Sequence, residues 1–369
     1  MIDPKYPKHL RTRRRALLRC LAVGLLPALL LAACGDDDAT SSPDQPWQPG
    51  PFGVGVQQVT FTKKSATVPT QDRILPTDIW YPTEPNTGPI DSTLGGVVGA
   101  PRAAATANLP LVLFSHGDCT LPEMSTFFMQ ALASWGFIIA APLDPGDLFT
   151  DPDCLAGPPL AIDAIANRVP DTRFVLDALL QLNGNPNSFL AGAINPNRIG
   201  MAGHSQGGRT TLLMSAVDQR VIAGLALAPG NPGGPSLRNI HTPIMAQGGT
   251  LDSIIPFDVF VQPIYNLLKP PKYLVEIAHT GHQAFLDTGC YPAVPTPICD
   301  ATGPDALTAD AAHQLILRYA VPFLLHWVAG DDRFDAFLAP DAAPPGVIVT
   351  TDTGGSSTSA TPTATVGSP

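Results

Sequence analysis

Short apolar runs alternate with segments of helical periodicity across residues 109–328. The apolar runs have the length and composition of buried strands. They cover residues 109–115, 137–142, 198–202, 223–228, 243–247 and 273–277. The helical patterns cover residues 123–134, 171–182, 208–217, 257–268 and 307–328. This alternation predicts an α/β fold with a mostly parallel, doubly wound sheet.

Two further strands are predicted upstream of this region. Residues 54–62 alternate between apolar and polar side chains, which is typical of an edge strand, and residues 77–81 are expected to pair with them. The predicted sheet therefore has about eight strands. Residues 88–107 consist mainly of small side chains and show no pattern.

The N-terminus has the pattern of an export signal. Seven Lys and Arg residues precede or enter an apolar segment, residues 17–33, which ends in Leu31-Ala32-Ala33-Cys34. This tetrapeptide resembles the lipobox of bacterial lipoproteins, and the resemblance implies that Cys34 is the lipidated first residue of the mature chain. A transmembrane helix is the alternative, but Gly24 and Pro27 interrupt a run that is already short for a span.

Composition divides the remainder of the chain into three parts. Residues 34–51 are rich in Asp, Ser and Pro and are predicted to be a flexible tether, and residues 339–369 are predicted to be a disordered, low-complexity tail. Between them, residues 52–338 are long enough for one large domain. The net charge of −10 with only 14% charged residues argues against a nucleic-acid-binding surface.

Four cysteines remain in the predicted domain. An even number in an exported chain indicates two disulfides, for which three pairings are possible. A Cys290–Cys299 bond would close a local loop and leave Cys119 to pair with Cys154. A zinc site is the alternative, but the chain lacks the close C-x-x-C pairs typical of zinc, and no phosphate-binding loop is visible. No metal or cofactor is therefore expected.

The stretch Gly203-His204-Ser205-Gln206-Gly207 fits the G-x-S-x-G pattern between a predicted strand and a predicted helix. In this setting the pattern forms a strained turn that exposes the hydroxyl of the Ser. Gly203 and Gly207 are required because a Cβ at either position would collide with the neighbouring strand or helix. The following helix points free N–H groups toward a developing negative charge.

Three other strand ends carry candidate chemistry. Asp252 lies on a turn just after the strand 243–247, and His282 follows Gly281 after the strand 273–277. The strand 109–115 ends in a small-residue turn that reaches Asp118. Reactive groups of doubly wound sheets lie beyond the carboxyl ends of the strands, so these residues are expected to meet Ser205 at one edge of the sheet.

With Ser, Asp and His in this order, the chain resembles the α/β-hydrolase superfamily. More narrowly, it is similar to dienelactone hydrolases and to platelet-activating-factor acetylhydrolase-like esterases. The matching stretches lie at residues 111–117, 131–137, 140–142, 171–177, 203–208 and 281–282. The turn after His116-Gly117 departs from the pattern, because Asp118-Cys119 stand where such families often carry an apolar residue and a Gly.

The resemblance implies a catalytic triad of Ser205, Asp252 and His282. Backbone N–H groups of Gln206 and Asp118 would form the oxyanion hole. His279 is the alternative base and Asp144 the alternative acid. His204 and His116 are interpreted as structural residues, and Asp287 and Asp147 as loop carboxylates.

These residues predict an exported serine carboxylic-ester hydrolase that works through an acyl-enzyme. The short connection after the strand 223–228 leaves no room for a cap domain, so the expected cleft is open and suited to lipid-like or polymeric esters. The expected location is the cell envelope, through an N-terminal lipid anchor, or the extracellular medium. An acyltransferase with the same triad and a non-catalytic binding protein on a hydrolase scaffold are the alternatives.

Overall fold

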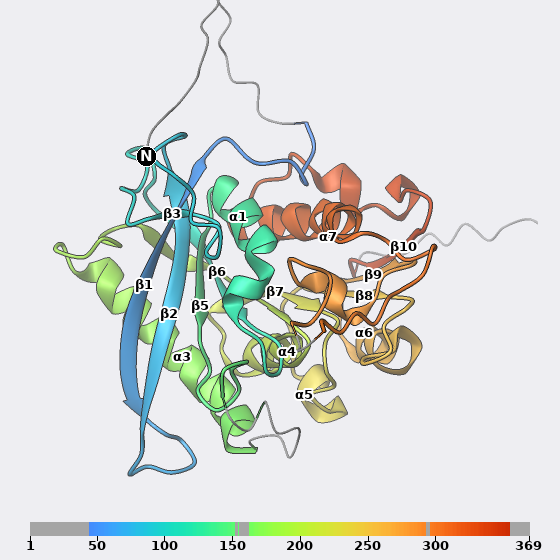
Figure 1. Ribbon diagram of the computed structural model, residues 1–369, viewed down its shortest axis with the longest axis horizontal. Helices are drawn as coiled ribbons and strands as arrows, with labels where there is room; N and C mark the ends of the chain where they lie inside the picture. Colours follow the sequence, from blue (N-terminus) through green and yellow to red (C-terminus); the bar gives the residue numbers. More distant parts are fainter. Residues whose placement is uncertain (1–43, 152–153, 155–161, 293–295, 355–369) are drawn as a thin grey trace, which may run out of the picture. The chain divides into compact units, whose positions relative to one another are not determined.

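The computed structural model describes residues 44–151, 154, 162–292 and 296–354. The predicted signal peptide, the lipidation site at Cys34 and the last part of the predicted tail lie outside these ranges. The described chain is organised around one ten-stranded sheet with the order β10-β9-β8-β7-β6-β4-β5-β2-β1-β3 (Figure 1). The strands are β1 Gly53–Lys64, β2 Asp72–Thr83, β3 Val97–Val98, β4 Leu109–Ser115, β5 Ile138–Pro142, β6 Ile194–His204, β7 Val221–Leu227, β8 Ile244–Gly249, β9 Lys272–Ile277 and β10 Val347–Asp352.

The middle of the sheet is parallel, as predicted. Strands β4 to β9 run parallel to one another, whereas β2 joins them antiparallel through β5. The chain runs from β4 to β5 on one side and then crosses to β6 on the other side of β4. This reversal creates a switch point between β4 and β6, where open α/β sheets place their ligands.

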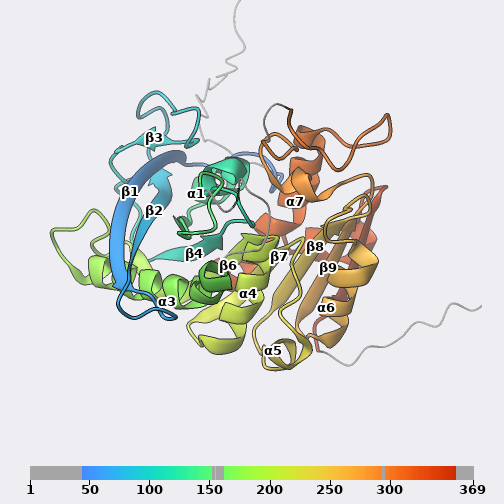
Figure 2. The same ribbon diagram turned by 60° about the horizontal axis from the view of Figure 1, so that its bottom comes forward.

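Helices cover both faces of the sheet (Figure 2). Helices α1 Thr126–Ser134 and α7 Ala309–Leu324 pack on one face, and α3 Ile162–Gly184, α4 Gln206–Val217 and α6 Gln262–Leu267 pack on the other. The short α5 Gly234–Arg238 lies between β7 and β8. The central strands are apolar on both sides because both of their faces are covered; all five residues of β5 are buried. In β1, by contrast, partly buried and exposed residues alternate through most of the strand.

The C-terminal segment departs from the predicted disordered tail. Residues 347–352 form β10, which pairs antiparallel with β9 in the register Val347↔Ile277 to Asp352↔Lys272. Val347 and Val349 alternate with exposed residues and are each 7% exposed. The β-branched run Val347-Ile348-Val349-Thr350-Thr351 explains the strand, since these residues favour a pleated surface. With the two-residue β3, this strand raises the number of strands from about eight to ten.

The end of the predicted flexible tether is docked on the domain. The indole of Trp47 packs edge-on against Phe337, with ring centroids 5.6 Å apart, and the guanidinium of Arg318 lies 4.9 Å from the Trp47 ring. Trp135 Nε1 donates a hydrogen bond to the Gln48 carbonyl over 3.1 Å. The apolar and aromatic side chains of residues 47–52 overcome the loop-like composition, so the domain begins several residues before position 52.

Helix α3 begins earlier than residue 171 and contains Pro170. Proline removes one helical hydrogen bond and is tolerated best in the first turn of a helix. For this reason the sequence pattern predicts a helix that begins just after Pro170. The residues before it are held by tertiary contacts instead, because Asn167 and Arg168 are buried and bonded to distant segments. Over the described ranges, no helix has the length and apolar character needed to span a membrane.

Candidate active site

Ser205 occupies the sharp turn between β6 and α4. Its backbone has φ 56° and ψ −116°, a left-handed conformation that side chains rarely adopt. The Ser205 N–H donates to Leu227 O over 2.8 Å, which ties the turn to β7. This conformation is the strained elbow expected from the sequence pattern.

The two glycines of the pattern are required by lack of space. A Cβ on Gly203 would lie 2.7 Å from the carbonyl oxygen of Ser115, and a Cβ on Gly207 would lie 2.7 Å from that of His116. Real Cβ atoms do not approach backbone so closely, so the close approach of the β6–α4 turn to the end of β4 depends on both glycines.

The side chains of His282 and Asp252 are joined by a hydrogen bond. His282 Nδ1 lies 2.8 Å from Asp252 Oδ2, and the two residues are only 3% and 4% exposed. The other carboxylate oxygen of Asp252 accepts from the N–H groups of Ile254 and Ile255, at 2.9 and 2.6 Å. The carboxylate is therefore fixed by its own turn, and it orients the imidazole through Nδ1.

The alternative base and acid lie elsewhere. The ring of His279 is exposed, and its backbone N–H is bonded to Thr250 Oγ1. Asp144 is buried beside Arg168, with Oδ2 and Nη1 3.0 Å apart, and burial raises the pKa of this carboxyl to about 7. Asp144 thus belongs to an ion pair behind the site, whereas Asp252 is bonded to His282.

His204 and His116 take structural positions. His204 Nε2 donates to the carbonyl of His282 over 3.1 Å, and its ring stacks on Phe285. His116 accepts from the Asp144 N–H at Nε2 and donates from Nδ1 to the Gly117 carbonyl, which requires a neutral ring. Burial, followed by the charge of Arg168, lowers the pKa of His116 to about 3, in keeping with this neutral state.

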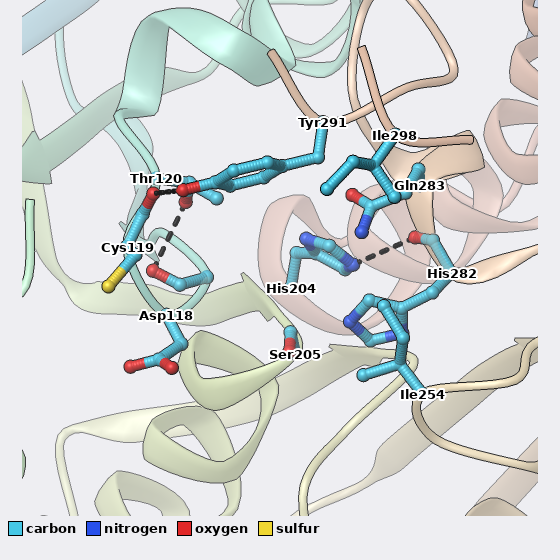
Figure 3. A pocket seen from close by; sticks show the side chains of 11 residues that line it. Asp118, Cys119, Thr120, His204, Ser205, Ile254, His282, Gln283, Tyr291 and Ile298 are labelled. Atoms are coloured by element: carbon cyan, nitrogen blue, oxygen red, sulfur yellow. Dashed lines mark hydrogen bonds between the residues drawn. The ribbon is translucent and has the colours of Figure 1, made fainter. Parts of the chain in front are cut away.

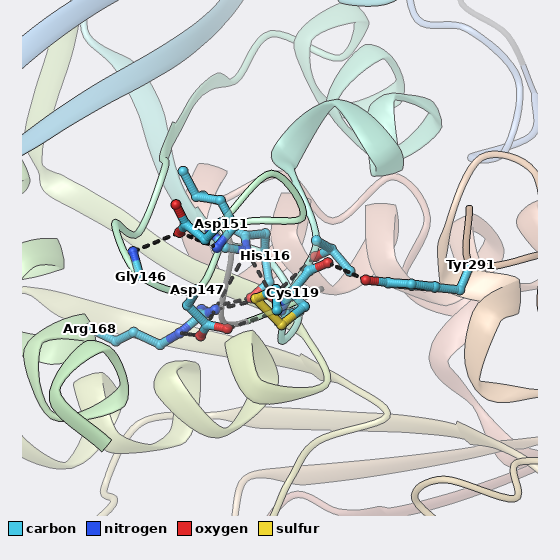
Figure 4. Close-up of a disulfide and its surroundings, with 11 residues drawn as sticks. His116, Cys119, Gly146, Asp147, Asp151, Arg168 and Tyr291 are labelled. Atoms are coloured by element: carbon cyan, nitrogen blue, oxygen red, sulfur yellow. Dashed lines mark hydrogen bonds and ion pairs between the residues drawn. A yellow bond between two sulfur atoms is a disulfide. The ribbon is translucent and has the colours of Figure 1, made fainter. Parts of the chain in front are cut away.

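The end of β4 and the loop after it, residues 116–120, are held by a buried arginine on α3 (Figure 4). Arg168 is 1% exposed, and its guanidinium donates to Ser115 Oγ at 2.9 Å, His116 O at 2.7 Å and Gly117 O at 3.1 Å. Its Nε also donates to Asp147 Oδ2 at 2.8 Å. Burial, the largest single influence, would raise the pKa of Asp147, but the charge of Arg168 together with the hydrogen bonds from Asp118 and the Cys119 N–H outweighs it, and the pKa is lowered.

The two predicted oxyanion donors lie on α4 and on the loop after β4. Gln206 is the first residue of α4, and Asp118 lies in the arginine-held loop. Across the described chain, no group accepts a hydrogen bond from the backbone N–H of either residue. The Asp118 side chain is partly buried; desolvation, followed by the neighbouring Asp147, raises the pKa of its carboxyl to about 7.

Both predicted disulfides are formed. Cys119 pairs with Cys154, and Cys290 pairs with Cys299. Among the described residues, Cys119, Cys154 and Asp147 are the one group close enough to share a metal ion. The two sulfurs are joined to each other and Asp147 is bonded to Arg168, so the group does not fit a metal.

Ser205, His282 and the loop after β4 surround one pocket of about 290 Å³ (Figure 3). The part of the chain that the structure describes contains no hydrogen bond between Ser205 and His282; such catalytic contacts are often long before substrate binds. The apolar wall of the pocket includes Ile254 and Ile298, which are 49% and 57% exposed. The pocket is therefore open to solvent along an apolar edge.

Two polar residues near the site, Arg168 and Asp300, have no signal in the sequence, and Asp287, interpreted as a loop carboxylate, has a more specific role. Arg168 holds the loop after β4, and the carboxylate of Asp300 accepts hydrogen bonds from the backbone N–H groups of His282 and Gln283. Asp287 caps α1, since its carboxylate accepts from the N–H groups of Thr126 and Phe127 at 3.0 and 2.9 Å. None of these pairings has a local sequence signal, because the partners lie on segments that meet only in the folded chain.

Comparison with known proteins identifies relatives at low identity. Residues 160–291 match the PET hydrolase-like family. A bis(hydroxyethyl) terephthalate hydrolase of Streptomyces coelicolor is 23% identical over 248 residues, which are 67% of this chain and 66% of that protein. A cutinase of Thermobifida alba is also 23% identical over 248 residues, 67% of this chain and 69% of the cutinase. The match thus spans just under two thirds of the first of these relatives.

A ferulic acid esterase from Streptomyces cinnamoneus has a similar structure, with a TM-score of 0.62 and 21% sequence identity. The similarity covers 81% of this chain and 97% of the esterase. Together the comparisons confirm the predicted fold and the predicted resemblance to ester hydrolases. The chain has the α/β-hydrolase fold and is similar to carboxylic-ester hydrolases of the PET hydrolase-like kind.

Proposed function

We propose that this protein is a serine carboxylic-ester hydrolase that works through an acyl-enzyme. Ser205 is the nucleophile, His282 the base and Asp252 the acid that orients the base. The observation that carries the proposal is the 2.8 Å bond between Asp252 and His282 beside the same pocket as the strained Ser205. A purely structural Ser would have no reason to occupy this backbone conformation at the switch point of the sheet.

Acylation begins when Ser205 Oγ attacks the carbonyl carbon of the ester. His282 Nε2 takes the hydroxyl proton as the new C–O bond forms, and it returns this proton to the leaving alcohol when the tetrahedral intermediate collapses. Asp252 accepts the hydrogen bond from Nδ1 throughout, which keeps the reactive tautomer and stabilises the imidazolium. In the second half of the reaction, water attacks the acyl group with His282 again as base.

The oxyanion hole is assigned to the backbone N–H groups of Gln206 and Asp118. The Gln206 N–H stands at the first turn of α4, where the helix dipole favours negative charge. The Asp118 N–H shares its peptide plane with the Gly117 carbonyl, which accepts hydrogen bonds from Arg168, His116 and Thr120. Because N–H and C=O point in opposite directions in a trans peptide, bonds on the carbonyl side hold the N–H toward the pocket.

The open, apolar-edged pocket supports a bulky ester as substrate. No long insertion covers it between β7 and β8, where the chain forms only the short α5. The named relatives include a hydrolase of bis(hydroxyethyl) terephthalate and a cutinase. We therefore assign lipid-like or polymeric esters to this cleft, with the exposed Ile254 and Ile298 as contacts for the apolar part.

Export and lipid anchoring are part of the proposal. Two disulfides in one domain favour an oxidising compartment outside the cytoplasm. With a signal peptide over residues 1–33 and lipidation at Cys34, a tether would join the anchor to the docked segment at Trp47. The wild type is expected to incorporate radiolabelled palmitate. Loss of this labelling in Cys34→Ala would support the anchor, and equal labelling of the wild type and the variant would contradict it.

The test of the catalytic assignment is covalent labelling with a fluorophosphonate. Mass spectrometry of the labelled wild type is expected to locate a single adduct on Ser205, and Ser205→Ala is expected to show none. His282→Ala should react at least about 100-fold more slowly, since the base contributes on that scale. Hydrolysis of p-nitrophenyl butyrate by the same three proteins gives the corresponding turnover.

Thermal unfolding of each variant serves as the control that it is folded. A folded wild type that neither reacts nor hydrolyses esters would overturn the proposed function. Retained activity in a folded Ser205→Ala would assign the nucleophile to another residue.

A further inference from the structure

We propose that the hairpin closed by the Cys290–Cys299 disulfide positions both halves of the active site at once. The hairpin comprises residues 290–292 and 296–300 of the described chain. Within the hairpin, Asp300 positions the backbone at His282 and Gln283. Tyr291 positions the loop after β4 that carries Asp118, called the oxyanion loop below. The inference rests on the proposed roles of His282 and Asp118.

The hairpin is a cross-linked unit. The disulfide joins Cys290 and Cys299, whose Cα atoms are 4.4 Å apart. One step further in, Tyr291 and Ile298 exchange two backbone hydrogen bonds of 2.8 and 2.9 Å. Both of these residues also line the pocket. A covalent bond and a backbone bridge therefore keep the two sides of the hairpin in register.

The first contact holds the loop of the base. The carboxylate of Asp300, directly after Cys299, accepts from the His282 N–H through Oδ2 and from the Gln283 N–H through Oδ1, the latter at 3.0 Å. Both N–H groups belong to the first turn of the short 3₁₀ helix His282–Phe285, where they lack helical partners. A carboxylate that takes two successive N–H groups fixes the backbone from which the imidazole extends.

The residue before the base leaves room for this contact. A Cβ on Gly281 would lie 2.6–2.7 Å from the carboxylate atoms of Asp300. Gly281 has φ −99°, which any residue can adopt, so its backbone conformation does not require a glycine. The glycine before His282 is therefore explained by the approach of Asp300.

The second contact holds the oxyanion loop. The Tyr291 hydroxyl donates to the Cys119 carbonyl over 2.9 Å (Figure 3). Cys119 directly follows Asp118 and has φ 51°, and its N–H donates to Asp147 at 3.0 Å. The N–H of this strained residue is thus bonded to Asp147, which pairs with Arg168, and its carbonyl is bonded to the hairpin. Tyr291 itself is braced by Phe149, edge-on at 5.6 Å.

One element therefore spans the pocket from the base to the oxyanion loop. The relative placement of these two parts decides catalytic geometry, and small errors of placement cost rate much more than they cost stability. The hairpin contacts backbone atoms on both sides, so it sets where the reacting groups stand without touching the substrate carbonyl.

Two point variants separate the two contacts. Asp300→Asn keeps the shape but offers one acceptor oxygen to two N–H groups, and Tyr291→Phe removes only the hydroxyl. For each we expect kcat on p-nitrophenyl butyrate to fall about tenfold, with KM changed by less than about twofold. Cys290→Ser combined with Cys299→Ser should lower kcat by about as much as Asp300→Asn and Tyr291→Phe together.

Matched controls come from the same chain. Asp305→Asn neutralises an exposed carboxylate a few residues along, and Tyr265→Phe removes a hydroxyl from α6, the helix that contacts β9; both should keep the kcat of the wild type. Thermal unfolding before each assay identifies variants that fail to fold. If Cys290→Ser/Cys299→Ser does not fold, the two point variants decide.

The outcomes distinguish this inference from the proposed function. Wild type that reacts with fluorophosphonate at Ser205, together with folded Asp300→Asn and Tyr291→Phe of unchanged kcat, would overturn the positioning role alone. Lower melting temperature with unchanged kcat would likewise make the hairpin merely structural. Unreactive wild type would overturn the proposed function itself.

Discussion

Arg168 donates from Nη2 to the carbonyl oxygen of Gly117, 3.1 Å away, and so fixes the peptide that carries the Asp118 N–H. The arginine comes from α3, more than 50 residues along the chain, and is buried to 1% exposure. The same guanidinium compensates two buried carboxylates, Asp144 and Asp147. Arg168 therefore both fixes the loop that carries the proposed oxyanion donor Asp118 and neutralises two buried carboxylates.

Replacing Arg168 by Met should destabilise the fold by about 3–5 kcal/mol, because it leaves two buried carboxylates without their cation. Arg168→Lys should recover only part of this, since an ammonium cannot reproduce the fork of donors. Urea unfolding of both variants at pH 8 measures the loss. As a control, Arg238→Met removes a charge at the end of the short α5 and should change the free energy of unfolding by less than about 0.5 kcal/mol. A stable Arg168→Met protein would show that the carboxylates tolerate burial unpaired.

Gly207→Ala should impair both folding and turnover. The added Cβ would lie 2.5 Å from the Ser115 carbonyl carbon, so the end of β4 or the start of α4 must move. We expect a loss of about 1–3 kcal/mol in stability and of at least about 100-fold in kcat, because Ser205 and the proposed oxyanion donors would shift together. Chemical denaturation and ester turnover measure the two effects.

Gly184→Ala is the matched control for this substitution, since a Cβ there meets no atom within 4 Å. It should keep the stability and kcat of the wild type. Equal behaviour of Gly207→Ala and Gly184→Ala would contradict the steric account of the elbow.

Much of the site was predictable because its signals are local. Ser205, Asp252 and His282 each follow a predicted strand within a few residues, and strand ends meet at one edge of a parallel sheet. Strands β1, β2 and β4 to β9 were predictable from their apolar or alternating patterns for the same reason. No local pattern predicts the individual contacts between these side chains; the folded structure shows them.

The missed features show two different causes. Arg168, Asp287 and Asp300 act on segments distant in sequence, so their identity as loop or helix residues says nothing of their partners. Strand β10 did have a local signal in its β-branched run, but the surrounding Thr, Ser, Pro and Gly composition concealed it. Long-range pairing with the edge of β9 is what makes this short run a strand.

That pairing predicts a stability cost for truncation. A chain that ends after Ala343 loses β10, exposes the edge of β9 and uncovers the side of the sheet on which Val347 and Val349 are buried. Burial of two valines amounts to about 3 kcal/mol, and an open edge favours association. Urea unfolding and light scattering measure these effects. A chain that ends after Gly354 keeps β10 entire and is the control; equal stability of the two truncated chains would make β10 dispensable.

The pH dependence of activity should report on Asp118. Desolvation, followed by the hydrogen bond and charge of Asp147, raises the pKa of this carboxyl to about 7, whereas an unfolded carboxyl has 3.8. Between these values the folded state binds the additional proton, so this group makes folding less favourable as pH rises from about 4 to 7. Above about 7 the ionised carboxylate lies beside the N–H assigned to the oxyanion, and its charge opposes the negative charge that develops there.

Asp118→Asn removes that charge while keeping the backbone N–H and the approximate shape of the side chain. We expect a variant-to-wild-type ratio of kcat/KM near one at pH 5.5, and a ratio of about three to ten at pH 8.5, as for a charge at intermediate distance and dielectric. Turnover of a neutral p-nitrophenyl ester over this pH range measures the ratio. A ratio that stays constant with pH would mean that Asp118 does not ionise in this range or that its charge does not reach the reacting atoms. A ratio that falls as pH rises would reverse the sign and assign the carboxylate a favourable role in the reaction.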